Sequence, residues 1–429
     1  MKIAIIGTGI SGMTAAWLLH RDHEITVFEA EPRIGGHTHT VDVVLGGKTY
    51  AVDTGFIVYN RDTYPNFIRI LEAFGVETQP SNMSFSVRCE RSGLEYSSSN
   101  LFAQRQRLLD PKHYGLIADI LRFNQAGHAF IETGDTQTTL GDFVARHRLG
   151  EAFRDRYLIP MLAAIWSADP ARVLDFPAQH FLKFFKNHGL MQVLGRPTWR
   201  VIQGGSRCYA EKLTAPWRDR LRLACPVESV TRLSGEVLVK ARGVEAELFD
   251  HVIFATHSNT TLSMLQHPTD AEREILGAIA YQSNEVVLHT DTSLLPREGR
   301  AWASWNYRIP EEPEATAKLT YNMNRLQGLD APETFCVTLN DTPAINPQKI
   351  LRTFVYDHPV FNAKALAAQR RHAEISGQRN THFCGAYWGY GFHEDGVNSG
   401  LRVAAYFGKG LEHAELPVSR ASAAPALHG

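Results

Sequence analysis

The chain has 429 residues, of which 44% are hydrophobic, and its 44 basic and 45 acidic side chains leave a formal charge of -1. This composition is typical of a globular protein of two or three domains, and the charge balance gives no reason to expect nucleic acid as a partner. The five cysteines are scattered without a CxxC pair, which predicts neither a zinc site nor a disulfide framework. With no signal peptide and no apolar run of membrane-spanning length, we expect a cytoplasmic location.

The first thirty residues carry a pattern typical of dinucleotide binding. An apolar run, Ile3 to Ile6, is followed at once by Gly7, Gly9 and Gly12, and a helical segment then leads to a second strand that ends near Glu29. The first glycine permits a tight turn, the second lets the backbone approach a pyrophosphate, and the third lets the helix pack closely on the strand. The helix N-terminus favours phosphates, and Glu29 is expected to bind a ribose.

A second glycine pair, Gly35 and Gly36, lies six and seven residues after Glu29. This E-x(5)-G-G spacing is similar to that of flavoproteins of the glutathione-reductase-like class. Taken over its whole length, the chain resembles the flavin-containing amine oxidase and phytoene desaturase superfamily. It is most similar there to bacterial predicted FAD-binding oxidoreductases that are linked to modified fatty acids. The resemblance implies an α/β fold, a Rossmann-like FAD-binding domain with an inserted α+β substrate domain, and non-covalent FAD.

The middle of the chain divides into alternating blocks. Residues 39–60 alternate apolar and polar side chains about Gly46-Gly47, which predicts a hairpin. Helical patterns fill residues 81–199, and strand patterns fill residues 266–375. We therefore expect a discontinuous FAD-binding domain (1–80, 200–265 and 376–415), a substrate domain with a helical insertion (81–199 and 266–375) and a disordered tail (416–429).

The C-terminal segment resembles the end of the superfamily's cofactor domain. The strand THFCGAYW is expected to carry Gly385 to the pyrophosphate, and a helix is expected from about Ser399. The run DGVNSG would bring Asp395, Gly396 and Val397 beneath the pyrimidine end of the flavin. The two ends of the chain would thus meet on one cofactor.

Residue by residue, the resemblance implies an extended set of FAD contacts. They are Gly7, Gly9, Ile10, Ser11, Gly12, Glu29, Ala30, Gly35, Gly36, His37, Thr38, Thr54, Gly55, Phe56, Val227, Ala255, Gly385, Asp395, Gly396 and Val397.

The sequence indicates the catalytic residues less clearly than it indicates the cofactor contacts. Many members of the superfamily carry a lysine near the flavin N5 on a strand that aligns with Ser283 to His289, where this chain has Asn284 or Glu285. The candidates for acid–base chemistry are His37, His39, Tyr59, His289, His358, His393, Glu394 and Asp395. Of these, His393 is the first choice of base and Tyr59 the second. Asn284, at the position of the lysine, is a further catalytic candidate. Aromatic residues expected near the substrate are Trp166, Tyr387, Trp388 and Tyr390.

The stretch from Phe176 to Trp199 mixes aromatic, basic and aliphatic residues. Such a helix can lie on a membrane surface, line a lipid tunnel or simply pack in a core. The first of these would place the protein peripherally at the inner face of the membrane.

The missing lysine and the apolar character of this stretch favour hydride removal from a C–H bond of an apolar substrate, and the resemblance implies a fatty-acyl desaturase acting on methylated or furan-precursor chains. A flavin-dependent double-bond isomerase, an amine oxidase and a non-catalytic redox sensor remain as alternatives.

Overall fold

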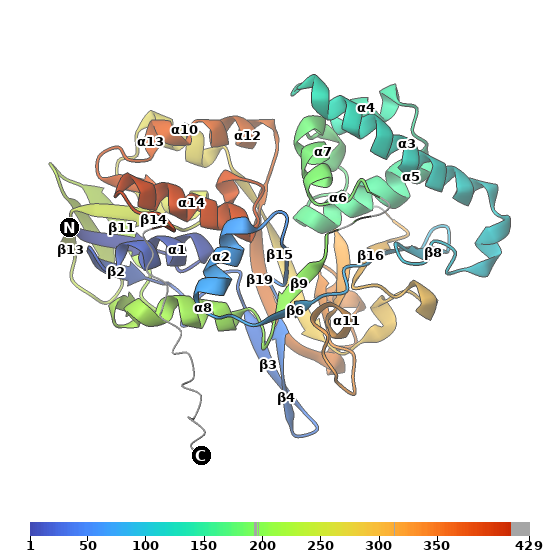
Figure 1. Ribbon diagram of the computed structural model, residues 1–429, viewed down its shortest axis with the longest axis horizontal. Helices are drawn as coiled ribbons and strands as arrows, with labels where there is room; N and C mark the ends of the chain where they lie inside the picture. The colour runs from blue at the N-terminus through green and yellow to red at the C-terminus, as the bar shows by residue number, and fades with distance from the viewer. Residues whose placement is uncertain (193–194, 196, 313, 413–429) are drawn as a thin grey trace, which may run out of the picture.

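The computed structural model describes residues 1–192, 195, 197–312 and 314–412, so the predicted tail lies outside the described residues. Figure 1 shows two lobes, one built around β1 and α1 and the other around a second sheet with a layer of helices beside it. Among the described residues, no helix is long and apolar enough to cross a membrane.

The first lobe is built on a five-stranded parallel sheet whose strands come from distant parts of the chain. Its order is β10 (Leu221–Arg222), β2 (Glu24–Phe28), β1 (Lys2–Ile6), β14 (His251–Phe254) and β20 (Thr381–Phe383). The central strand is β1, and Ile3 to Ile6 are at most 3% exposed, as a strand covered on both faces requires. The predicted α/β class is confirmed.

Helices and small sheets surround this parallel sheet. The helices are α1 (Ile10–Leu19), α2 (Pro65–Ala73), α8 (Arg207–Thr214), α9 (Ser258–Met264), α10 (Asp270–Gly277), α12 (Ala363–Arg370), α13 (His372–Ile375) and α14 (His393–Tyr406). The small sheets are β11 (Val227–Arg232), β12 (Val237–Ala241) and β13 (Glu247–Phe249), then β5 (Val58–Asn60), β9 (Trp199–Ile202) and β6 (Thr78–Pro80).

The hairpin predicted about Gly46-Gly47 is confirmed as β3 (Thr40–Leu45) and β4 (Lys48–Asp53). Leu45 pairs with Lys48, and the two glycines between them have φ of 58° and 78°. A two-residue hairpin turn needs positive φ at both positions, which glycine adopts without steric cost.

The C-terminal elements differ from the prediction. The strand β20 ends at Phe383, and the helix α14 begins at His393 instead of about Ser399. The carboxylate of Asp395 accepts the Phe392 backbone N–H at 2.9 Å and so caps the helix. Glu394 and Asp395 therefore lie in the first turn of α14.

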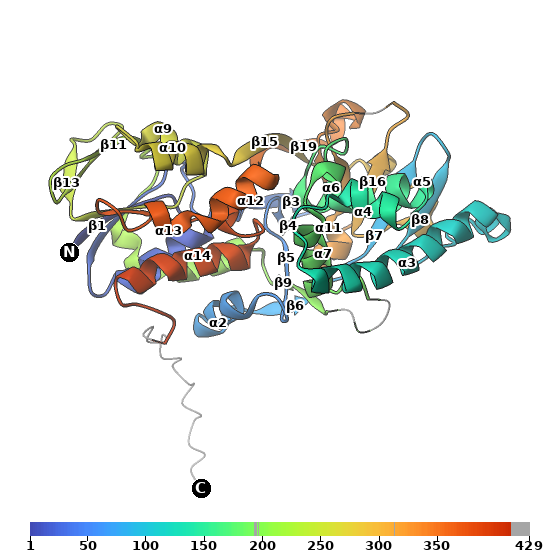
Figure 2. The same cartoon turned by 90° about the horizontal axis from the view of Figure 1, so that it is seen from above.

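The second lobe contains a seven-stranded mixed sheet. Its order is β19 (Ile350–Val360), β15 (Ala280–His289), β18 (Cys336–Leu339), β17 (Lys318–Asn322), β16 (Trp305–Ile309), β7 (Phe85–Cys89) and β8 (Leu94–Ser97). The short helix α11 (Met323–Gln327) follows β17. The long pair β15 and β19 extends back beside the first lobe, as Figures 1 and 2 show.

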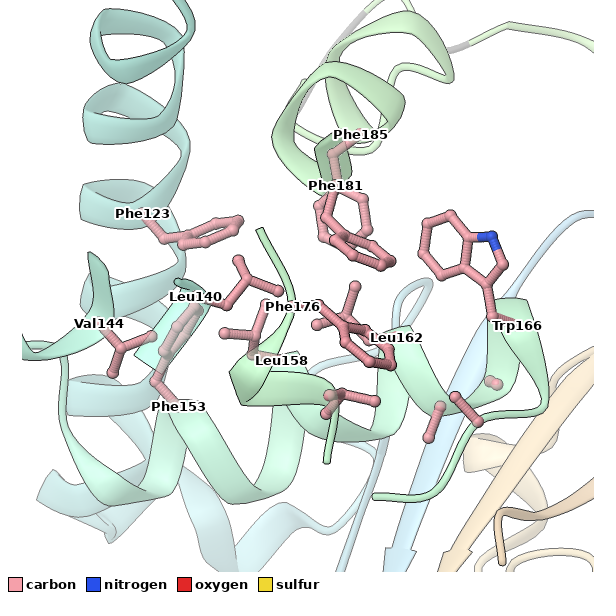
Figure 3. Packing of buried hydrophobic residues seen from close by; sticks show 14 of the residues in the cluster. Phe123, Leu140, Val144, Phe153, Leu158, Leu162, Trp166, Phe176, Phe181 and Phe185 are labelled. Atoms are coloured by element: carbon pink, nitrogen blue, oxygen red, sulfur yellow. The ribbon is translucent and has the colours of Figure 1, made fainter. Parts of the chain in front are cut away.

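A helical layer with an aromatic core completes the second lobe. Its helices are α3 (Pro111–Thr133), α4 (Leu140–Arg146), α5 (Glu151–Phe153), α6 (Ile159–Trp166) and α7 (Ala178–Asn187). Figure 3 shows Phe123, Phe153 and Phe181 from three of these helices directed into one cluster.

The aromatic face of α7 belongs to this core. Phe181, Phe184 and Phe185 are at most 3% exposed and pack in the cluster of Figure 3 and its surroundings. The interpretation of this helix as a membrane-facing surface is therefore wrong. Of the three readings that the sequence left open, packing in the core explains its aromatic side chains.

Three glycines set how closely α1 lies to its neighbours. A Cβ added to Gly12 would lie 2.1 Å from the Gly7 carbonyl oxygen. On α14, a Cβ at Gly396 would lie 2.5 Å from Ile10 Cγ2, and one at Gly400 would lie 2.6 Å from the Ser11 carbonyl oxygen. The two ends of the chain are thus joined through surfaces that have no room for a side chain.

We expect Gly400→Ala to destabilise the protein and Gly115→Ala, in α3, to stabilise it. Both glycines are helical, and alanine gains roughly 0.5–1 kcal/mol from helix propensity at either position. A Cβ at Gly115 meets no atom within 4 Å, whereas at Gly400 it meets backbone, so α14 must shift from α1. Urea denaturation of the two variants tests this, and equal stability would contradict the close packing of α1 and α14.

Candidate functional site

The glycine loop after β1 has the geometry that its spacing predicts. Gly7 has φ of 104°, in the region that favours glycine, and donates its N–H to the Phe28 carbonyl at 2.8 Å. Gly9 directly precedes α1, and a Cβ there would meet no atom within 4 Å. No side chain caps the N-terminus of α1. The loop therefore presents bare backbone and a positive helix end to open space, which is the arrangement that binds a pyrophosphate.

Thr8 connects this loop to the acid and to the second glycine pair. The Glu29 carboxylate accepts the Thr8 N–H at 2.8 Å and the Glu31 N–H at 3.0 Å, and it also accepts the Thr8 hydroxyl. Gly35 donates its N–H to the Thr8 carbonyl at 3.1 Å. The structure thus brings Glu29 and Gly35 to the same loop, and it gives Glu29 a second task as acceptor for the local backbone.

Other predicted cofactor contacts converge on the same place. Ala255, at the end of β14, would touch a Cβ on Gly7 or Gly12. The Cys225 N–H donates to the Glu29 carbonyl at 2.8 Å, which holds the segment containing Val227 beside the acid. From the C-terminal end, the Gly385 N–H donates to Ser399 Oγ at 3.0 Å. These contacts place four distant segments around the N-terminus of α1.

The residues around this point fit FAD. The open space at Gly9 and the uncapped helix end suit the pyrophosphate, and Glu29 suits the ribose. The buried Nε2 of His37, next to Gly36, has no hydrogen-bond partner among the described residues. A buried polar atom without a partner is costly, so a group that binds between the lobes would relieve it.

Cys384 does not offer a covalent attachment point. It is fully buried in the core of the first lobe, and burial raises the pKa of its thiol to about 12. A thiol of that pKa stays protonated and is a poor nucleophile. This supports the expectation that FAD is bound without a covalent bond.

His393 lies in a buried cluster that joins three segments. Its Nε2 is 3.0 Å from Thr38 Oγ1 and 2.9 Å from the Tyr209 hydroxyl, and its ring stacks on Phe56. Burial lowers the pKa of His393 to about 3, so the imidazole is neutral at every ordinary pH. Tyr59, the second candidate base, is also buried, and Phe67 contacts both Tyr59 and His393.

The position of the superfamily lysine is filled by a hydrogen-bonded amide. Asn284 on β15 is fully buried, whereas the neighbouring Glu285 is exposed. The Asn284 amide lies 2.9 Å from His358 Nδ1 on β19, and its oxygen accepts from Asn340 Nδ2 at 2.7 Å. Of the two residues that the sequence left open, Asn284 is the one turned inward.

Backbone contacts at the far end of this network fix the tautomer of His358. Asn340 Oδ1 accepts the Glu285 N–H at 3.1 Å, so the Asn340 Nδ2 group must donate to Asn284. The Asn284 Nδ2 group then donates to His358 Nδ1, and in the neutral ring the proton lies on Nε2. Burial lowers the pKa of His358 to about 4, which keeps this neutral form.

His358 is one of three neighbouring histidines where the lobes meet. Its ring centroid is 5.4 Å from that of His37, and the His37 centroid is 5.6 Å from that of His257. Burial lowers the pKa of each of them. Tyr356, two residues before His358, shares its hydroxyl with His39 Nδ1 at 2.7 Å and Thr54 Oγ1 at 2.8 Å. No group of acidic, histidine or cysteine side chains in the described part of the chain could hold a metal ion.

The four aromatic residues predicted near the substrate fall into two clusters. Trp166 donates its indole N–H to the Tyr390 carbonyl at 3.2 Å and packs on Phe181 and Phe184. Tyr387 and Trp388 instead pack in the first lobe beneath α12 and α13, with Gln369 bonded to the Tyr387 carbonyl. The structure therefore brings Trp166 and Tyr390 together but separates them from the other pair.

Several residues of the site carry no pattern in the sequence. Tyr209 lies 184 residues before its partner His393, and Asn340 lies 56 residues after Asn284. Asp53 is the last residue of the hairpin strand β4. Its buried carboxylate accepts Ser206 N–H at 2.9 Å and Gln327 Nε2 at 2.9 Å, which ties the hairpin to α8 and α11. Burial raises the pKa of Asp53 to about 6.

Two of the cavities formed by the described residues lie near the surface. The larger, of about 510 Å³, is lined by charged residues such as Arg21 and Arg222 at the start of β2. Ligands of open parallel sheets bind at the opposite, carboxyl ends of the strands. The smaller, of about 300 Å³, is lined by Met83, His188 and Trp199 among others, and His188 stacks on Phe184 of the aromatic core. The smaller cavity therefore lies beside the aromatic core of the second lobe.

We expect Gly9→Val to abolish tight FAD binding while the FAD-free protein keeps its stability. The new side chain meets no protein atom near its Cβ but fills the space that suits the pyrophosphate. FAD affinity should fall by at least about tenfold, or about 1.4 kcal/mol. Fluorescence titration with FAD and thermal unfolding of the apoprotein measure the two effects. Gly12→Val is the contrast, because its side chain collides with Gly7 and should destabilise the apoprotein itself.

Buried neutral histidines should make the folded protein sensitive to acid. Burial lowers the pKa to about 4 or about 3 in His39, His180, His188, His289, His358, His382 and His393. Unfolded histidines have a pKa of about 6.5, so below that pH the unfolded chain binds more protons and the free energy of unfolding falls. Asp53 and Asp395 act in the opposite direction, because burial raises the pKa of each from its ordinary 3.8 to about 6, but the histidines outnumber them.

Urea denaturation from about pH 7 to about pH 5 should therefore show falling stability, by up to about 1.4 kcal/mol per pH unit for each fully buried histidine. His358→Gln should give a shallower slope than the parent protein, because one such group has been removed. An unchanged slope in this variant would contradict a neutral, buried His358.

Comparison with known proteins agrees with this geometry. The family model of flavin containing amine oxidoreductases matches residues 10–406. Flavin-containing amine oxidase A from Sus scrofa is 24% identical over 285 residues, which cover 62% of this chain and only 52% of that protein.

Two solved structures show the same fold. A fatty acid isomerase from P. acnes that produces CLA superposes with a TM-score of 0.69 at 17% identity, covering 94% of this chain and 98% of that one. Cyclohexylamine oxidase from Brevibacterium oxydans superposes with a TM-score of 0.65 at 17% identity, with the same coverage. With its glycine loop, its acid and its two chain ends gathered at one cofactor site, the chain belongs to the flavin-containing amine oxidoreductase family and is an FAD-dependent oxidoreductase.

Proposed function

We propose that this enzyme removes a hydride from a carbon of a fatty-acyl chain. The observation that carries the proposal is how the two acids that follow His393 are hydrogen-bonded. The Glu394 carboxylate accepts the backbone N–H groups of Asn66 and Phe67 at 3.1 and 2.9 Å, and Asp395 caps its own helix. Both carboxylates are thus engaged by backbone and are unsuited to hold an ammonium group, which disfavours an amine substrate.

The wall itself suits an apolar chain. Trp166, Phe184, Tyr390 and Phe392 pack on one another, and His180 stacks on Tyr390 with ring centroids 4.4 Å apart. The cavity of about 300 Å³ beside His188 is of the size of a small-molecule site. Each buried CH₂ group would contribute about 0.8 kcal/mol to binding.

Asn284 supports the same proposal. Superfamily members often carry a lysine on the strand that aligns with β15, and here that position is a neutral amide. The amide holds His358 in one tautomer, with its Nε2–H available as a donor. A neutral donor in place of a cation suits an enzyme for which rapid reoxidation by oxygen is not required.

When bound, FAD accepts the hydride, and the accompanying proton needs an acceptor on this chain. His393 remains the candidate, because its ring is neutral and lies close to the cofactor-binding segment at Thr38. A pKa of about 3 makes it a weak base, so proton removal would have to follow or accompany hydride departure.

One alternative to desaturation would act on the same class of substrate. One structural neighbour is a fatty acid isomerase, and isomerisation moves a double bond without net oxidation. The similarity of fold alone does not favour either of the two reactions. They differ in whether reduced flavin accumulates.

Anaerobic mixing with fatty acids, fatty-acyl phospholipids and a panel of amines tests the proposal. We expect the absorbance of oxidised flavin to bleach with an acyl substrate and to stay constant with amines. A rearranged acyl product without bleaching would favour isomerisation, and bleaching by amines alone would overturn the fatty-acyl proposal.

Substitution of Tyr390 tests the wall. We expect Tyr390→Asp to weaken binding of the acyl substrate by at least about tenfold, because a carboxylate in an apolar wall is costly to desolvate. Tyr390→Leu keeps the surface apolar and should bind within a few-fold of the parent protein. The measurement is the concentration dependence of flavin bleaching, and equal effects of Asp and Leu would argue against the wall as the binding surface.

A further inference from the structure

An exposed apolar surface lies at the start of α3. Leu109 is 90% exposed, Leu108 51%, Tyr114 48% and Leu121 52%. We call these four residues the apolar tip. They lie within 14 residues of one another in the chain, whereas the other large exposed apolar residues of the described chain are scattered. Figures 1 and 2 both show the first turns of α3 at the end of the molecule farthest from the N-terminal lobe.

The tip is held by ordered contacts. The Tyr114 hydroxyl donates to the Leu108 carbonyl at 3.1 Å, and the Asp110 carboxylate accepts the Lys112 N–H at 3.0 Å as the N-cap of α3. Arg107 pairs with Asp110 at 3.0 Å. These contacts hold the backbone so that the leucines face solvent. An exposed apolar group of this kind commonly marks a site that binds a protein or a membrane.

Basic side chains surround the tip. Arg105 and Lys112 are exposed, and neither has an ion pair among the described residues. The only acids between residues 101 and 131 are Asp110 and Asp119, against Arg105, Arg107, Lys112 and Arg122. Both acids are already paired with arginines, Asp119 with Arg122 and Asp110 with Arg107. The segment from Arg105 to Arg122 thus combines exposed apolar side chains with a net positive charge of two, and Glu298 lies close enough to Arg105 to interact with its charge.

We propose that the apolar tip docks this enzyme on the surface of an anionic phospholipid bilayer. Leucine and tyrosine side chains enter the boundary between head groups and acyl chains, and the flanking arginine and lysine bind the phosphates. Four exposed side chains are few for a stable protein interface but can insert among lipids. This surface is not the α7 segment singled out in the sequence, because the aromatic face of α7 is buried. The inference does not depend on the identity of the substrate.

Sedimentation of the FAD-loaded enzyme with vesicles tests the proposal. We expect binding to vesicles of phosphatidylcholine mixed with phosphatidylglycerol, weaker binding to phosphatidylcholine alone, and weakening as salt rises. The double variant Leu108→Ser/Leu109→Ser should bind the mixed vesicles at least about tenfold more weakly. Arg105→Glu/Lys112→Glu should lose most of the preference for the anionic lipid.

Matched variants elsewhere on the surface provide the controls. Val44→Ser removes a 71% exposed apolar residue at the β3–β4 hairpin, and Arg273→Glu/Lys364→Glu reverses two exposed charges in the first lobe. Both should bind the vesicles as the parent does, and all variants should keep the flavin spectrum and thermal stability. Three results would overturn the proposal: no binding of the parent to the mixed vesicles, equal weakening in the controls, or a leucine variant that changes the oligomeric state and leaves vesicle binding unchanged.

Discussion

The cofactor-binding lobe depends on how closely α1 can approach the backbone of its neighbours. Gly12 lets the helix lie against the turn at Gly7, and Gly396 and Gly400 let α14 lie against the first turns of α1. At Gly12 and Gly400 a Cβ would collide with backbone, which cannot move without displacing a strand or a helix, and at Gly396 it would collide with the side chain of Ile10. Gly9, in contrast, faces open space. Within one short loop, Gly12 therefore allows close packing and Gly9 allows a ligand to approach the backbone.

This close approach also determines where the chemistry can occur. Because α14 is pressed on α1, its first residue His393 is carried to Thr38 and Tyr209, next to the cofactor-binding segment. From the other side, β15 and β19 bring Asn284 and His358 to the same region. The result is a set of buried imidazoles that stay neutral, bounded by backbone contacts that fix at least one tautomer. A neutral, hydrogen-bonded surface of this kind is consistent with hydride chemistry on an uncharged carbon chain.

The two lobes use their aromatic residues differently. Trp166 and Phe184 of the helical layer pack with Phe392, which precedes α14, and Phe184 stacks on His188, which lines a surface cavity. In the first lobe, Tyr387 and Trp388 fill the core under α12 and α13. The exposed leucines of the apolar tip belong to the same helical layer as the wall, so the lobe that we propose binds the acyl chain is also the one that we propose contacts lipid.

The sequence by itself determined the cofactor fold, because the glycine positions and the acid after the second strand follow from local backbone geometry, and Gly7, Gly9 and Gly12 behave as their spacing predicts. It also predicted the β3–β4 hairpin, whose turn requires positive φ. Only the tertiary structure decided which of Asn284 and Glu285 faces inward, that α7 is a core helix, and that Tyr209 meets His393 across 184 residues of chain. Local sequence patterns reflect the effect of a residue on its own backbone. Burial and side-chain partners depend instead on which distant surfaces pack against each other.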